Sequence, residues 1–216
     1  SEAFNVQSGT TIAGEPLEPE TGNNLEAGLR ASPLDGRLHT TASVYEITRR
    51  NLATADLANP GYFLTTGEQR SRGVELDARF LPVKGWELLG AYAYTDTAIT
   101  ADNAKPVGTR IAGVPLHTFN AWTKHTLQSG RWRGLGFGLG ASYTSAQDGD
   151  RTYTVNFQLP SYVLWRAALY YDRGPFRAQL NVTNLFDREH YVGAYDALYV
   201  SPGAPRNVRL TLGWKF

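Results

Sequence analysis

The chain has 216 residues, with 42% hydrophobic, 19% charged and 12% aromatic residues and a formal net charge of +1. The near-neutral charge and the absence of a long basic cluster argue against a nucleic-acid-binding protein. The absence of cysteine excludes disulfides, thiolate metal sites and cysteine nucleophiles, and no apolar run reaches the roughly 18 residues of a membrane-spanning helix.

Apolar and polar residues alternate with a period of two along most of the chain, which predicts β-strands. The first clear case, NLEAGLRAS, sets Leu25 and Leu29 against Glu26 and Arg30. Nine strands are predicted, in chain order over residues 22–32, 37–48, 70–81, 84–97, 116–128, 133–144, 161–171, 175–185 and 206–216. The sequences of 84–97 and 116–128 do not decide which of their faces is apolar.

The links between these strands alternate in length. The short links contain PLDG, PVK, SGRW and DRGP, and the long links are residues 49–69, 98–115, 145–160 and 186–205. In an up-and-down meander every second link lies on the same rim, so this alternation collects short turns at one end and long loops at the other. Strands of about 10 residues with this arrangement are typical of outer-membrane β-barrels. Tyr171, Trp214 and Phe216 would lie at the short-turn rim and Tyr143 near the other, as interfacial aromatic residues do.

A soluble β-sandwich or a lipocalin-like barrel also alternates in this way, and periodicity alone does not separate these folds from a membrane barrel. The regular alternation of links and the terminal aromatic residue favour the membrane barrel. Bacterial single-chain barrels have an even number of strands, and nine strands would leave two edges unpaired in lipid. Residues 1–216 are therefore expected to be the C-terminal segment of a larger transmembrane, antiparallel, up-and-down β-barrel.

Five motifs follow one another along the chain: LEPETGNNLEAGLR (17–30), RSRGVELDARF (70–80), GWELLGAYAYTDT (85–97), NVTNLFDREHY (181–191) and GAPRNVRLTLGWKF (203–216). In their order and spacing they resemble the TonB-dependent siderophore receptors of the ferrichrome-receptor type, over essentially the whole chain. The resemblance implies a plugged, all-β barrel of roughly 22 strands in the outer membrane of a Gram-negative bacterium, of which these are the last nine.

The same resemblance implies a function in binding and TonB-energised import of a ferric siderophore, without catalysis. The expected partners are the siderophore, the lipid of the outer membrane, and the N-terminal remainder of the receptor. That remainder would carry the earlier strands, the plug and the segment that contacts TonB, all outside this sequence. A diffusive porin-type barrel and, outside membranes, a soluble β-sandwich binding module are the alternatives.

Charged residues on the polar side of the strands should point into the lumen, since an arginine facing lipid at the midplane costs roughly 2–4 kcal/mol. The lumen-facing candidates for plug contact are Glu26, Arg30, Glu75, Asp77, Arg79, Arg177 and Arg209. The alternative is that these side chains only contact water inside the lumen.

Glycines at alternate positions lack the spacing of a dinucleotide fingerprint and are interpreted as a smooth inner wall that leaves room for the plug. These glycines are Gly134, Gly136, Gly138 and Gly140.

Aromatic residues in the long links are the candidates for siderophore contact, because aromatic faces and phenolic hydroxyls suit a bulky, oxygen-rich chelate. They are Tyr62, Phe63, Tyr153, Phe157, Tyr191, Tyr195 and Tyr199. The alternative is that these rings pack the loops against one another or belong to an interfacial girdle.

Two further predictions concern the histidines and the last strand. The four histidines, at positions 39, 117, 125 and 190, lack metal-ligand spacing, and no Ser-His-Asp arrangement is indicated. No catalytic residue, metal ligand or cofactor is therefore expected, and iron would arrive already chelated. Leu212, Trp214 and Phe216 resemble the C-terminal signal that the barrel-assembly machinery reads in outer-membrane proteins.

Overall fold

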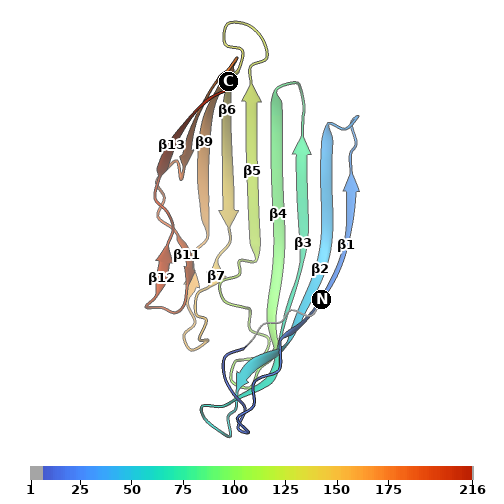
Figure 1. The fold of residues 1–216 in the computed structure, drawn as a ribbon, viewed down its shortest axis with the longest axis vertical. Helices are drawn as coiled ribbons and strands as arrows, with labels where there is room; N and C mark the ends of the chain where they lie inside the picture. Colours follow the sequence, from blue (N-terminus) through green and yellow to red (C-terminus); the bar gives the residue numbers. More distant parts are fainter. Residues whose placement is uncertain (1–6, 216) are drawn as a thin grey trace.

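The computed structural model describes residues 7–215, which form one antiparallel sheet of nine strands joined in sequence order (Figure 1). The strands are β1 (Thr21–Ala31), β2 (Leu38–Ala55), β3 (Phe63–Phe80), β4 (Trp86–Ala101), β5 (His117–Thr126), β6 (Leu135–Thr144), β9 (Tyr162–Arg173), β10 (Phe176–Thr183) and β13 (Asn207–Trp214). All nine predicted strands are present, which confirms the antiparallel all-β prediction. Within the described range no helix is long and apolar enough to cross a membrane.

The short turns lie at one end of the sheet and the links predicted to be long lie at the other, as the sequence predicts, although the link between β2 and β3 has only seven residues (56–62), fewer than the eight of the β5–β6 turn (127–134). In Figure 1 the short turns point up and the long loops point down. Two short hairpins lie inside the long loops, where the sequence predicted no strand. These are β7 (Gln147–Asp148) with β8 (Gln158–Leu159), and β11 (Tyr191–Ala194) with β12 (Val200–Pro202).

The strand register separates an apolar face from a polar face, because residues directly opposite in an antiparallel pair point to the same side. Leu180 of β10 lies opposite Leu169 of β9 and Leu210 of β13, within the apolar face. Its neighbour Gln179 lies opposite Tyr170 and Thr211, within the polar face. The register also settles the two strands that sequence left undecided: in β4 and β5, Tyr92 and Phe119 belong to the apolar face.

Aromatic side chains border the apolar face at both ends. Near the long loops, Tyr92 stacks on His117 with ring centroids 6.1 Å apart, and near the short turns Trp86 meets His125 edge-on at 6.1 Å. Tyr92 lies six positions after Trp86 in β4, a span of about 20 Å at roughly 3.3 Å per residue. This is close to the apolar band of roughly 25 Å found on outer-membrane barrels.

The two edge strands expose their apolar residues most. In β1, Leu25 and Leu29 are 76% and 81% exposed, and in β13 Leu212 and Trp214 are 62% and 61% exposed. Both β13 residues belong to the apolar face, opposite Ala178 and Phe176 respectively; Phe216, predicted to complete the assembly signal, lies outside the described residues. Within the described range, β1 and β13 each pair with one neighbour only.

β2 and β3 are longer than the sequence predicts, since the link predicted over residues 49–69 is largely strand. β2 continues to Ala55 and β3 begins at Phe63, paired through register shifts near Leu52. Extra residues at such bulges break the period of two. For this reason the alternation in the sequence ends before the strands do. Gln7 braces the bulge: its side-chain amide donates to the carbonyl of Asn51 (2.5 Å), and the Ala53 amide donates to its side-chain oxygen (2.6 Å).

The turn after β10 is fixed by one buried side chain. Asn184, 6% exposed and in the left-handed region at φ 48°, donates from its amide to the carbonyls of Arg188 (2.9 Å) and Ala204 (3.1 Å). Its side-chain oxygen accepts a hydrogen bond from the Arg188 amide at 2.8 Å. Asp187 adds a link by accepting from the Arg206 amide at 2.7 Å. The NLFDR motif thereby ties the exit of β10 to the segment that enters β13.

Candidate functional site

The polar face carries all seven charged residues predicted to face the lumen. The strand register gives each of them a partner position on the same face. The pairs are Glu26 with Tyr45, Arg30 with Thr41, Glu75 with Ser43, Asp77 with Thr41, Arg79 with His39, Arg177 with Gly213, and Arg209 with Asn181. Arg79 donates a hydrogen bond to Glu87 (2.6 Å), and Arg177 forms an ion pair with Asp172 (3.0 Å). The other five make no ion pair or side-chain hydrogen bond within residues 7–215, so their charges are available to a partner beyond that range.

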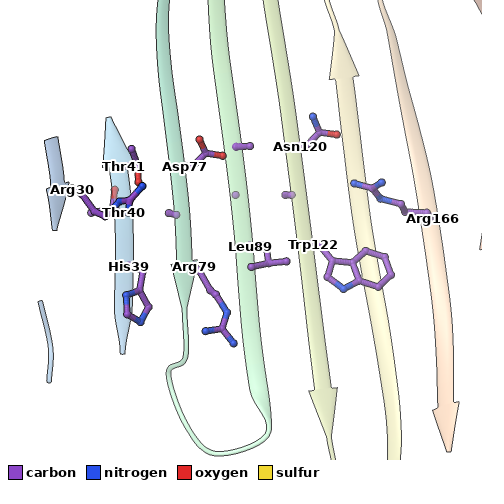
Figure 2. A pocket seen from close by; sticks show the side chains of 14 residues that line it. Arg30, His39, Thr40, Thr41, Asp77, Arg79, Leu89, Asn120, Trp122 and Arg166 are labelled. Atoms are coloured by element: carbon purple, nitrogen blue, oxygen red, sulfur yellow. The ribbon is translucent and has the colours of Figure 1, made fainter. Parts of the chain in front are cut away.

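A cavity of about 630 Å³ lies on this face at mid-height of the strands (Figure 2). Arg30, Asp77 and Arg79, named from the sequence, are among its lining residues. Asn120, Trp122 and Arg166 also line it, and sequence reasoning missed them. Arg166 could have been noticed as the single charge in the otherwise uncharged stretch SYVLWRAALYY.

The interpretation of the alternate glycines as a smooth inner wall is wrong at Gly138 and Gly140, because the Trp122 ring occupies the space beside them. A Cβ atom on Gly138 or Gly140 would lie 2.3 or 2.4 Å from ring atoms of Trp122. Aromatic side chains commonly cover glycines on a neighbouring strand. The guanidinium carbon of Arg166 lies 5.7 Å from the centre of the same ring, within range of a cation–π interaction. Gly138 and Gly140 thus make room for a tryptophan of this chain, whereas a Cβ atom on Gly136 would meet the Thr126 side chain and one on Gly134 the Asp172 backbone.

The aromatic candidates for siderophore contact fall into two groups. Tyr195 and Tyr199, at the tip of the β11–β12 hairpin, are 60% and 70% exposed, and Tyr62 and Tyr191 are also exposed. The other three are half-buried between loop segments: Phe63 lies against Gly9, Phe157 lies against Gly149, and the Tyr153 hydroxyl accepts a hydrogen bond from the Ala112 amide at 3.2 Å. The structure therefore leaves four of the seven side chains open to solvent.

The long loops are joined to one another. Besides the contact of Tyr153 with Ala112, the Arg151 amide donates to the Tyr195 carbonyl at 2.9 Å. The Asp150 carboxylate organises the middle loop by accepting hydrogen bonds from the side chain of Thr152 (2.5 Å) and from the amides of Thr154 (2.7 Å) and Val155 (2.6 Å). These bonds, led by the one from Thr152, hold the pKa of Asp150 well below its usual range.

Acid is expected to loosen this loop. Because the pKa of Asp150 is lower in the folded loop than in an unfolded chain, where it is about 3.9, its contribution to stability is present above that pH and is lost as the pH falls further. Hydrogen exchange of the Thr154 and Val155 amides should accelerate between pH 5 and about pH 3 beyond the intrinsic pH effect. Asp150→Asn should exchange faster at pH 5 and lose this dependence, whereas Asp35→Asn, in a short turn, should behave as the parent. Equal protection factors at both pH values would contradict the assignment.

The histidines lie apart. His117 and His125 belong to the aromatic borders of the apolar face, His39 contacts Ser32 (3.0 Å), and His190 contacts the Arg188 carbonyl (3.1 Å). Among residues 7–215 no three His, Asp or Glu side chains come together in a way that could hold a metal ion.

Comparison with known proteins gives one family. The family described as "TonB dependent receptor-like, beta-barrel" matches residues 1–185. The metal-pseudopaline receptor CntO of Pseudomonas aeruginosa UCBPP-PA14 is 35% identical over 98% of this chain and 30% of its own length. The ferrichrome outer membrane transporter/phage receptor of Escherichia coli K12 is 31% identical over all of this chain and 29% of its own.

Solved structures share the fold. The siderophore receptor PiuA from Acinetobacter baumannii superposes with a TM-score of 0.81 at 24% identity, covering 93% of this chain and 29% of that receptor. Pseudomonas aeruginosa FpvA, bound to a heterologous pyoverdine and iron, gives a TM-score of 0.83 at 22% identity, covering 99% and 29%. The chain thus spans about 30% of the length of the proteins it matches.

Proposed function

Since this chain belongs to the TonB-dependent receptor-like β-barrel family, we propose that it supplies nine strands of a plugged outer-membrane barrel that binds and imports a ferric siderophore. Proteins of this family are receptors and transporters in the outer membrane of Gram-negative bacteria. The apolar face of the sheet, bordered by aromatic side chains, suits contact with lipid. The observation that carries the proposal is the opposite face, where five charged side chains have no partner among residues 7–215.

The remainder of the receptor is the partner that we propose for this face. It would provide about thirteen further strands and a plug, pairing with the edges β1 and β13 and covering the charges of the polar face. The chain spans 30% of the length of the relative CntO, which leaves room for a remainder of this size. Energy from the TonB system would enter through that remainder, because the plug must move for a ligand to pass.

The siderophore would bind first at the rim of the long loops. Tyr195 and Tyr199 offer the most exposed aromatic faces among the candidates, at 60% and 70%. Their backbones are joined, the Tyr195 amide donating to the Tyr199 carbonyl at 2.9 Å, so both rings are presented by one closed turn. Phenol rings held in this way can stack on a chelate and donate hydrogen bonds to its oxygen atoms.

The full receptor should therefore bind one ferric siderophore saturably, and a panel of ferrichrome, ferrioxamine B and ferric pyoverdine is a suitable first test. Replacing Tyr195 and Tyr199 together by alanine should raise the Kd about ten-fold, since each aromatic contact contributes roughly 0.5–1.5 kcal/mol. Tyr171→Ala, at the opposite rim, is the matched control and should leave the Kd unchanged.

Two results would contradict the proposed function. Uptake that persists in a TonB-deficient strain and does not saturate would favour a diffusive porin. A chain that stays folded and monodisperse in water without detergent would favour a soluble binding module.

A further inference from the structure

Arg166 is held in an unusual way in the cavity of the polar face. Its Nε atom is buried without a hydrogen-bond partner in the described part of the chain. The group lies over the backbone of Gly140, where a Cβ atom would come within 3.2 Å of Nε, and the guanidinium faces the Trp122 ring. Nε is thus turned toward the sheet, and the two Nη groups form the end of the side chain that faces the cavity. Figure 2 shows the side chain reaching toward Asn120 and Trp122.

No carboxylate of the described residues neutralises this arginine. In the cavity, Arg79 is already paired with Glu87, and Asp77 is the one acidic lining residue. Asp77 lies on β3 and Arg166 on β9, four strand positions apart in the sheet, which corresponds to about 19 Å at the usual spacing of strands. The charge of Arg166 is therefore not balanced by a carboxylate within residues 7–215, and neither Nη group makes a hydrogen bond to those residues.

The position of Arg166 narrows the choice of a partner. It lies on the polar face, so lipid does not reach it, and its partner strand position is Gly140, near the middle of β6. It is four residues from the start of β9, about 13 Å from the long-loop rim in the direction of the short turns. The Trp122 ring lies on one side of the guanidinium and the Nη end makes no hydrogen bond within residues 7–215, so the planar fork can accept a planar, two-oxygen anion more readily than a single point charge.

We propose that Asn120, Trp122 and Arg166, here called the Arg166 cradle, bind the carboxylate of an aspartate or glutamate in the plug. The inference rests on the proposed function, which requires a plug inside the barrel. The carboxylate meets both Nη groups end-on, because Nε is turned toward the sheet. The Asn120 amide lies on the same face of the neighbouring strand pair, opposite Ser142, where it can add a hydrogen bond. The cradle thereby holds one point of the plug against this wall of the barrel.

Photo-crosslinking in the full receptor tests the contact. A photoreactive residue at Ser142, beside the cradle on the polar face, should crosslink to a plug peptide that contains an aspartate or glutamate, identified by mass spectrometry. Arg166→Gln should lower the yield about ten-fold, because a charge-assisted pair is lost. Arg166→Lys keeps the charge without the planar fork and should give an intermediate yield. Arg133→Gln, in a short turn, is the control and should give the parent yield.

The inference is overturned by a yield that Arg166→Gln leaves unchanged, by a crosslinked plug peptide without an acidic residue, or by the absence of any plug crosslink. Heat-modifiable migration on gels verifies that each variant is folded, and Arg166→Lys serves if Arg166→Gln does not fold. Siderophore uptake is measured on the same variants. An Arg166-dependent crosslink without siderophore binding would refute the proposed function alone, whereas uptake with an Arg166-independent crosslink would refute the cradle alone.

Discussion

The variant Leu180→Arg of the full receptor is expected to lose about 2–4 kcal/mol of folding free energy in a bilayer. Leu180 lies in an apolar row with Leu169 and Leu210, away from both aromatic borders. An arginine there must either face hydrocarbon or distort the sheet to reach water. Urea titration of the receptor folded into lipid vesicles, followed by tryptophan fluorescence, measures the loss.

The matched control is the adjacent residue of the same strand. Gln179→Arg introduces the same side chain on the polar face, between Tyr170 and Thr211, and should change the unfolding free energy by less than about 1 kcal/mol. If both variants had the same unfolding free energy, or if Gln179→Arg were less stable than Leu180→Arg, the assignment of the apolar face to lipid would be wrong.

The second large effect is expected at Asn184. Asn184→Gly keeps the left-handed backbone available but removes three side-chain hydrogen bonds, to Arg188 twice and to Ala204 once. Buried carbonyl and amide groups left without partners should destabilise the receptor by about 3 kcal/mol. The unfolding free energy of the folded receptor is again the measurement, with limited proteolysis between β10 and β13 as a local readout.

Asn51→Gly separates the hydrogen bonds from the backbone effect. Asn51 also has a left-handed backbone, at φ 58°, but its side chain makes a single exposed hydrogen bond, to the Pro19 carbonyl at 3.3 Å. This variant should lose less than about 1 kcal/mol. Equal losses in the two variants would mean that asparagine matters in the NLFDR motif for its backbone conformation only.

Sequence periodicity predicts the nine strands because the register of a sheet with one apolar face repeats every two residues. It fails where this repeat is interrupted. The bulges near Leu52 interrupt the alternation, so the parts of β2 and β3 nearest the long loops were not predicted as strand. The two-residue strands β7 and β8 are too short to show any period. The faces of β4 needed the structure, since aromatic residues and alanines alternate there without a clear change in polarity.

The charged residues of the candidate site could be placed from sequence because a charge facing lipid is so costly that its side of the strand is decided. Trp122 and Arg166 could not be, since their roles depend on each other across three neighbouring strands. The contact of Trp122 with Gly138 and Gly140 is a property of register. Likewise, only the loop packing distinguishes the half-buried Tyr153 from the exposed Tyr199.

The bonds between the long loops bear on how this rim can be exchanged between proteins. A chimera that receives residues 145–160 from a relative would have to recreate the Arg151 amide contact with Tyr195 and the Tyr153 hydroxyl contact with Ala112. Loops of different length would leave those backbone groups unpaired. The three loops would therefore be exchanged most safely as a set, because successive single-loop replacements would pass through poorly ordered intermediates.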